Sequence, residues 1–318
     1  AERQRLFALP RSSWADYDPD LISEGGGVHP RSAKSIRITG QVRDALGMDP
    51  SVTSMAPNDL IRAILTAPVD LLWNGGIGTY LKASSESHAD VGDKANDAVR
   101  VNGADLRARA VGEGGNLGLT QLGRIECARA GGRINTDAID NSAGVDTSDH
   151  EVNIKILADG IVREGDLTEK QRNELLAAMT DEVGRLVLAN NYGQNVALAS
   201  GVYQAANLAH VHRGYVSKLE AEGKLNRALE FLPSDRQFAE RIQAGRGLTS
   251  PEMSVLLAYT KNLMYVELLD TPLPDDPYLR NALQAYFPTD LHNRYPERID
   301  EHPLRREIVT TRVVNDLV

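Results

Sequence analysis

Three short apolar runs in the first half of the chain each end in a polar turn, a pattern that predicts short strands. The turns are Asn74-Gly75-Gly76 after Val69–Trp73, Gly114-Gly115-Asn116 after Arg109–Glu113, and Asn141 after Arg133–Asp137. Helical patterns lie just before the first run, over Pro57–Ala67, and between the second and third runs, over Gln121–Ala130 with Thr120 as its N-cap. Strands that alternate with helices predict a partial Rossmann-like open α/β sheet in residues 1–148. Ligands of such sheets bind at the carboxyl ends of the strands, where these turns fall.

From about Ser148 onward the apolar positions follow a helical period, which predicts a mainly α-helical region over residues 149–318. Capping patterns predict helix starts at Thr168–Gln171, Ser234–Gln237 and Thr249–Glu252. The first of these helices is expected to break at Asn190–Gly193, and a second long one is expected from Gln194 to Glu222. Apolar spacing predicts a last helix over Leu304–Val318.

Composition narrows the class of protein. The chain has 318 residues, 42% of them hydrophobic and 25% charged, which is typical of a globular protein of about two domains. Its net charge of −9 argues against broad binding to nucleic acid or to anionic membranes. No uncharged apolar stretch approaches the roughly 18 residues that a membrane-spanning helix needs. The single cysteine, Cys127, allows no internal disulfide and no cysteine-based zinc cage, so a reducing cytoplasm is the expected location.

The two ends of the chain predict an excerpt from a longer polypeptide. Residue 1 is Ala rather than Met, and the first residues form a charged, proline-broken run that does not resemble a secretory signal. The predicted last helix stops at Val318 without a residue that commonly ends a helix.

The first candidate site is the turn Glu113-Gly114-Gly115-Asn116. Its glycines let the backbone approach a flat ligand closely, and the amide of Asn116 can hydrogen-bond a ribose or a carboxamide. The following helix directs its positive end toward the same place. The alternative is a tight strand-to-helix turn in which the glycines serve the backbone alone.

The second candidate site lies between Asp140 and Glu151. Asn141 and Ser148 are small polar residues where a strand is expected to give way to a helix, a common place for groups that orient a substrate. Ser148 and Glu151 also form a capping-box pattern, which alone could account for both.

Other polar groups are weaker candidates. Gly76-Ile77-Gly78 lacks the third glycine of a dinucleotide-binding loop, because Leu81 occupies that position. No metal site is predicted, because the histidines form no cluster with ligand spacing. Lys82 and Lys94 are expected to be solvated surface lysines, and Cys127 is expected to be a packing residue.

Together these segments resemble a known family. Glu113-Gly114-Gly115-Asn116, and Asn141-Ser142-Ala143-Gly144-Val145 followed by Ser148, are similar to a pair of motifs in amino-acid dehydrogenases. The longer segments LLWNGGIGTY, VGEGGNLGLTQLGRIE and GGRINTDAIDNSAGVDTSDHEVNIK resemble the large, multidomain bacterial NAD-specific glutamate dehydrogenases. The resemblance extends through the helical region to Val318.

The resemblance implies oxidative deamination of L-glutamate to 2-oxoglutarate and ammonia, with a hydride passing to NAD. It implies that Asn116 and Asn141 lie near the nicotinamide and that Ser148 binds the α-carboxylate of glutamate. The remaining implied cofactor-binding residues are Asn74, Gly75, Gly76, Glu113, Gly114 and Gly115. The catalytic lysines and aspartate of the family belong to a preceding domain, so no catalytic residue is expected in this chain, which alone is expected to lack turnover. A homo-oligomer is the implied assembly.

Two alternatives stay open at this point. The first keeps the fold and changes the substrate to another amino acid, because the residues that choose the side chain are not identifiable. The second is a non-catalytic helical assembly or regulatory module whose glycine turns serve structure alone.

Overall fold

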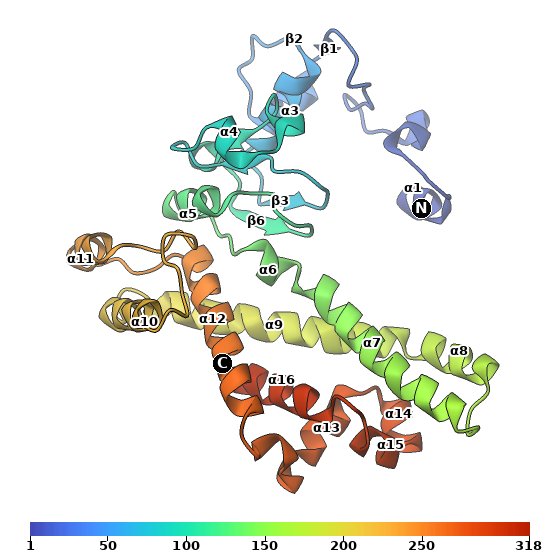
Figure 1. Cartoon of the computed structure of the whole chain (residues 1–318). Helices are drawn as coiled ribbons and strands as arrows, with labels where there is room; N and C mark the ends of the chain where they lie inside the picture. Colours follow the sequence, from blue (N-terminus) through green and yellow to red (C-terminus); the bar gives the residue numbers. More distant parts are fainter. The chain divides into compact units, whose positions relative to one another are not determined.

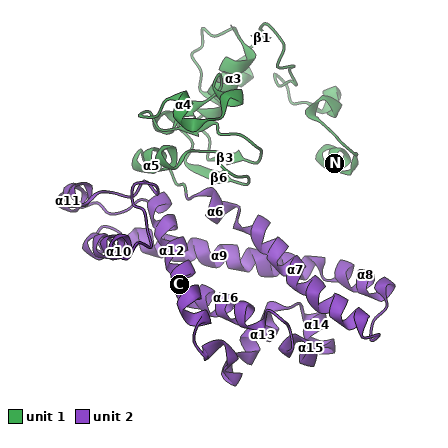
Figure 2. Ribbon diagram, viewed as in Figure 1, with its two compact units in different colours: residues 1–134 green, residues 135–318 purple.

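The computed structural model describes all residues from 1 to 318. The chain divides into two compact units, Ala1–Ile134 and Asn135–Val318 (Figure 2). The first mixes short strands and helices and the second is helical, which confirms the predicted order of an α/β region followed by a helical one (Figure 1).

The first unit contains three two-stranded sheets. Strands β3 (Leu71–Asn74) and β6 (Ala110–Glu113) pair in parallel, as do β4 (Leu81–Lys82) and β5 (Val101–Asn102). Strands β1 (Ile36–Arg37) and β2 (Ser54–Met55) pair antiparallel. The helices of this unit are α1 (Glu2–Ala8), α2 (Gly40–Leu46), α3 (Pro57–Leu65), α4 (His88–Val91) and α5 (Gln121–Arg129).

Two of the three predicted strands form, and the third does not. At the third, only Arg133 pairs with a strand, through a single bridge to Ala110. The amide of Val111 donates to the carbonyl of Arg133, and the chain then turns into α6 (Asp137–Asp140). The prediction of a strand over Arg133–Asp137 is therefore wrong, because the backbone of Thr136 already accepts the first hydrogen bonds of a helix.

The second unit is built from helices. They are α6, α7 (Ser142–Arg163), α8 (Glu169–Ala178), α9 (Thr180–Gln204), α10 (Ala209–Ala221), α11 (Asp235–Gln243), α12 (Ser250–Leu269), α13 (Arg280–Tyr286), α14 (Thr289–Arg294), α15 (Pro296–Asp300) and α16 (Arg305–Leu317). The capping boxes predicted at Thr168, Ser234 and Thr249 are all present, as is the predicted last helix. No helix combines the length and the apolar character needed to cross a bilayer.

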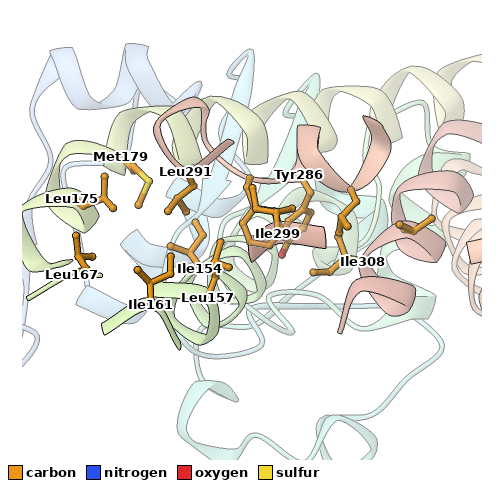
Figure 3. Close-up of a cluster of buried hydrophobic side chains, with 13 residues drawn as sticks. Ile154, Leu157, Ile161, Leu167, Leu175, Met179, Tyr286, Leu291, Ile299 and Ile308 are labelled. Carbon is orange, nitrogen blue, oxygen red and sulfur yellow. The ribbon is translucent and has the colours of Figure 1, made fainter. Parts of the chain in front are cut away.

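Two apolar clusters hold these helices together. One gathers side chains from α7, from α8 and from the helices after residue 280, among them Ile161, Leu291 and Ile299 (Figure 3). The other surrounds Phe238 and Val216, which are fully buried. Burial of large apolar side chains is the main source of stability in such a unit.

The predicted break at Asn190–Gly193 is wrong, because α9 runs through it and the chain breaks earlier, at Met179. Asn190 donates to Asp146 at 2.8 Å, and Asn191 donates to the hydroxyl of Ser142 at 2.8 Å. These amides bond to α7 rather than to their own backbone, so they do not stop the helix. The helix expected over Gln194–Glu222 is interrupted after Gln204. There Gly247 approaches so closely that an added Cβ would lie 2.1 Å from the carbonyl oxygen of Ala205.

Candidate functional site

The parallel pairing of β3 with β6 brings two predicted turns to one edge of a sheet. Asn74 is the register partner of Glu113, so both strands end at the same level. The amide of Gly114 donates to the carbonyl of Asn74 at 2.8 Å, immediately beyond the strands. The carboxyl edge of a parallel sheet is a usual place for a ligand, and this edge carries both turns.

The loops that follow the two strands are joined to each other. We call residues 75–80 and 114–119 the paired loops. The hydroxyl of Thr79 donates to the carbonyl of Leu117 at 2.7 Å, and the amide of Tyr80 donates to the carbonyl of Gly118 at 2.9 Å. A Cβ added to Gly115 would lie 2.8 Å from the carbonyl oxygen of Gly76. The loops therefore approach each other at a distance that only glycine permits at this position.

The outer surface of the paired loops is exposed and partly apolar. Ile77 is 96% exposed and Leu117 is 64% exposed, and Asn116 beside Leu117 is exposed as well. Leu117 has a φ of 57°, in the left-handed region that non-glycine residues rarely adopt. Backbone held in this way is concentrated at functional sites, where the surrounding structure fixes it.

Asn74 lies beneath the paired loops. Its Oδ1 accepts from the amide of Gly76 at 3.4 Å, while its Nδ2 is buried and has no hydrogen-bond partner. A Cβ added to Gly118 would lie only 2.0 Å from that Nδ2, so the side chain of Asn74 sits directly under the second loop. An unpartnered buried amide is costly, which makes Asn74 a group that a ligand or a small loop movement could satisfy.

Glu113 is fully buried, at 0% exposure, and its carboxylate contacts α5. Oε2 accepts from Arg124 Nε at 2.7 Å, and Oε1 accepts from Arg124 Nη2 at 2.9 Å. Oε1 also accepts from the amide of Leu119 at 3.2 Å. Sequence reasoning missed Arg124. The available signal was that Arg124 is the first charged residue of the helix that follows the turn, four positions after the Thr120 cap.

The first turn of α5 behaves as predicted. The hydroxyl of Thr120 accepts from the amide of Gly123 at 3.0 Å, which confirms the N-cap. Cys127 is buried in the same helix, and burial raises the pKa of its thiol to about 11, which suits a packing residue and not a nucleophile.

The expectation that Lys82 is a solvated surface lysine is wrong. Its side chain is buried and donates to Oδ1 of Asn102 at 2.6 Å and to the carbonyl of Ala83 at 3.1 Å.

The first of the paired loops is anchored from a third segment that the sequence did not single out. Asp93 accepts from the amide of Thr79 at 2.9 Å and from Asn96 at 2.7 Å, and the Asn96 bond is the larger cause of the lowered pKa of Asp93. Arg100, whose side chain is fully buried, donates to the carbonyl of Thr79 at 2.8 Å. Both backbone groups of Thr79, its amide and its carbonyl, are therefore held by side chains.

Asn141 and Ser148 belong to the second unit. Asn141 is the residue between α6 and α7, so no strand precedes it, and the predicted strand-to-helix junction is wrong. A Cβ added to Gly144 would lie 3.1 Å from Oδ1 of Asn141. Asn191 of α9 reinforces this junction by donating to the carbonyl of Ile139 at 2.8 Å.

Ser148 lies inside α7 and is exposed. Its hydroxyl donates to the carbonyl of Gly144 at 3.3 Å, one turn earlier in the same helix. The capping box with Glu151 is therefore wrong, since the helix begins at Ser142, and Glu151 pairs with Lys155 instead. Ser148 is therefore an exposed helical residue whose hydroxyl bonds to the backbone of its own helix.

A buried polar cluster follows on the same helix. His150 stacks on Tyr286 with ring centroids 4.2 Å apart, and the hydroxyl of Tyr286 donates to Asp149 at 2.7 Å. Asn153 donates to the same hydroxyl at 2.9 Å. Burial lowers the pKa of His150 and raises that of Tyr286. No group of three or more His, Cys, Asp or Glu side chains is arranged to hold a metal ion.

The predicted site residues thus fall into two sets. The first set, residues 74–76 and 113–116, lies at one sheet edge. Of the second set, Asn141 precedes α7 and Ser148 lies within it. The first set offers glycine backbone and an exposed amide and holds no titratable group at its surface, so it can bind and orient a ligand but cannot transfer a proton.

Comparison with known proteins agrees with these motifs. Residues 1–201 match the family model for the catalytic domain of bacterial NAD-glutamate dehydrogenase, and residues 245–318 match that for the glutamate dehydrogenase C-terminal region. Similar proteins are the NAD-specific glutamate dehydrogenases of Halomonas elongata, 56% identical over 318 residues, and of Pseudomonas aeruginosa, 57% identical over 317 residues. That of Mycobacterium tuberculosis is 57% identical over 322 residues. Each match covers 100% of this chain and 19–20% of the relative, so the chain spans about a fifth of their length. This chain belongs to the bacterial NAD-glutamate dehydrogenase family.

Proposed function

We propose that the chain forms part of an NAD-dependent glutamate dehydrogenase and supplies groups that hold the nicotinamide end of the cofactor. The reaction is the oxidative deamination of L-glutamate with water to 2-oxoglutarate and ammonia. NAD, when bound, accepts the hydride that leaves the α-carbon. The protein's part in hydride transfer is alignment, because no side chain needs to donate or accept the hydride.

The observation that carries the proposal is the meeting of two glycine-asparagine turns at the carboxyl edge of β3 and β6. The residues fit a flat, polar ring: Gly75 and Gly76 leave backbone exposed, no atom lies within 4 Å of a Cβ added to Gly76, and the amide of Asn116 is exposed beside them. Asn116 would hydrogen-bond the carboxamide or ribose. Gly114 and Gly115 would permit close approach, and Glu113 and Asn74 would support the turn from below.

For Asn141 and Ser148, in the second unit, the proposal rests on the family resemblance. Asn141 would contact the nicotinamide end, and the exposed hydroxyl of Ser148 would donate to the α-carboxylate of glutamate. Proton transfer in deamination requires a general acid–base that we do not assign to this chain, so the 318 residues alone are expected to lack turnover. Glutamate-dependent formation of NADH by the purified chain would contradict that expectation.

The test is Asn116→Ala in the natural polypeptide that carries this sequence. Loss of a hydrogen bond to a bound ligand predicts about tenfold weaker NADH binding. Asn173→Ala, at an exposed asparagine of α8, is the matched control and should leave binding within about twofold. Unchanged catalytic efficiency in Asn116→Ala would place the nicotinamide elsewhere. Substrate profiling of the same protein tests glutamate against other amino acids.

A helical packing role is a second candidate, and one surface favours it. Leu188, Tyr192, Val196 and Tyr203 are exposed apolar side chains along α9. Exposed apolar rows of this kind commonly mark contact surfaces between proteins. The dehydrogenase proposal also includes a homo-oligomer and a cytoplasmic location. Sedimentation of wild type and Tyr192→Ser tests whether this surface makes the assembly. NADH titration of wild type separates the two candidates, because a module that serves packing alone is expected to bind no NADH.

A further inference from the structure

The carboxylate of Glu113 joins three parts of the first unit. It lies at the end of β6, immediately before Gly114, and its Oε1 accepts from the amide of Leu119 at 3.2 Å, immediately after Gly118. Arg124 then binds both carboxylate oxygens, at 2.7 and 2.9 Å, from the end of the first turn of α5. The turn from Gly114 to Gly118 is therefore closed at its base by one side chain, and that side chain is fixed by another.

We propose that Arg124 is a positioning residue for the cofactor. Through Glu113 it fixes both ends of the Gly114–Gly118 turn, and so it sets where the amide of Asn116 stands. This inference rests on the function proposed above.

Arginine is suited to this task in a way that lysine is not. A guanidinium bonds both oxygens of a carboxylate in one plane, so it fixes the rotation of the carboxylate as well as its distance. A lysine ammonium supplies the charge but no second, coplanar bond. The orientation of the Glu113 carboxylate decides whether Oε1 faces Leu119, and so the shape of the turn depends on the bidentate contact.

Stability alone is a weak reason for this pair. Desolvation of two buried charges offsets much of their attraction, and a neutral pair of similar volume is often equally stable. The exposed fractions are 4% for Arg124 and 0% for Glu113, so desolvation is nearly complete. If the pair serves to position the turn, a different result is expected. A neutral pair at positions 113 and 124 should fold normally but leave the cofactor-binding groups displaced.

The second unit offers a matched control. Arg241 of α11 binds Glu252 of α12 in the same bidentate manner, at 2.9 and 2.7 Å, and Glu252 is equally buried. Glu252 also accepts from the amide and the hydroxyl of Thr249, so this pair closes a helix cap. The same double substitution there removes an equivalent buried ion pair without touching the Gly114–Gly118 turn.

The experiment uses the natural polypeptide that carries this sequence. We would compare Arg124→Lys, the double variant Glu113→Gln with Arg124→Met, and the control double variant Glu252→Gln with Arg241→Met. NADH fluorescence titration measures cofactor binding, steady-state kinetics separate KM for NAD from KM for glutamate, and thermal unfolding reports the fold. The double variants avoid the single Arg124→Met, which leaves a buried carboxylate without its guanidinium and is expected to fold poorly.

We expect Arg124→Lys and the Glu113→Gln/Arg124→Met protein to keep a melting temperature close to that of wild type. NADH binding should weaken by about tenfold, the cost of about one lost, well-oriented hydrogen bond to the ligand. KM for NAD should rise with it, whereas KM for glutamate and NADH binding by the Arg241 control should stay within about twofold.

NADH binding by the Glu113→Gln/Arg124→Met protein as tight as that of wild type would overturn the inference, because the pair would then serve folding alone. An equal loss in the control pair would overturn it as well. If wild type binds NADH and Asn116→Ala binds it equally well, the proposed function fails first, and that result is distinct from a failure of Arg124 alone.

Discussion

The two compact units are stabilised by different kinds of contact. The second unit buries two large apolar clusters, around Ile299 and around Phe238, between long helices. The first unit buries one small cluster, in which Leu81, Val111 and Leu119 are central. Its strands are two to four residues long, and Leu71 and Trp73 of β3 are exposed on one face. The first unit therefore depends much more on hydrogen bonds and close backbone contacts.

That difference suits the roles we propose. Hydrogen bonds are directional, so the contacts of Thr79, Tyr80 and Gly114 fix the positions of individual backbone groups in the paired loops. Apolar contacts are not directional and stabilise a helical unit without fixing any one polar atom. A ligand site needs the first kind, because its groups must be held to within a fraction of an ångström.

The largest expected effect tests the apolar side of this comparison. Phe238→Ala removes a fully buried ring from the second unit and should cost about 3–5 kcal/mol of unfolding free energy. Urea denaturation of the purified chain measures it. Phe7→Ala is the control, because Phe7 is 93% exposed and its loss should cost less than about 0.5 kcal/mol. Equal effects at the two positions would remove the basis for assigning stability to the apolar clusters.

A smaller effect tests the polar side. Thr79→Val keeps the shape of the side chain and removes the hydroxyl that donates to the carbonyl of Leu117. We expect a loss of about 1 kcal/mol in unfolding free energy and a severalfold weaker binding of NADH by the natural polypeptide. Thr311→Val removes a hydroxyl that donates to Glu307 within α16 and should leave NADH binding unchanged. A Thr79→Val protein with normal NADH affinity would mean that the paired loops need no side-chain bond.

The features that the sequence predicts well are local. The caps at Thr120, Thr168, Ser234 and Thr249 depend on residues three positions apart, and all of them form. The ends of β3 and β6 follow from short apolar runs before glycine. The convergence of the two turns depends on the parallel pairing of β3 with β6, which an open α/β sheet favours.

The features that the sequence predicts poorly depend on partners far along the chain. Asn191 looked like a helix breaker, but its amide is used by Ser142, 49 residues earlier. Lys82 looked solvated, but Asn102 accepts from it in the interior. Arg100 and Asp93 anchor Thr79 from 21 and 14 residues away. The sequence alone shows which functional group a side chain carries. Whether that side chain is buried depends on the distant segment that packs against it.

The smallest expected effect concerns pH and sharpens the comparison within the second unit. Burial lowers the pKa of His150 below its ordinary 6.5, and Arg312 acts in the same direction, while Asp146 and Asp149 oppose both. The unfolded chain therefore takes up a proton near pH 6.5 that the folded chain resists. The stability contributed by neutral His150 is present above that pH and is lost as the pH falls through the lowered pKa.

His150→Phe should flatten this dependence, because phenylalanine keeps the stacking on Tyr286 and carries no proton. We expect wild type to lose more melting temperature than His150→Phe between pH 7.5 and pH 5, with the two curves closest at the alkaline end. His29→Phe, at an exposed histidine of the first unit, should follow the wild-type curve. Parallel curves for wild type and His150→Phe would show that the cluster around Tyr286 accommodates a charged imidazole. In that case the polar contacts around Tyr286 would tolerate rearrangement. The hydrogen bonds of the paired loops, by our proposal, would not.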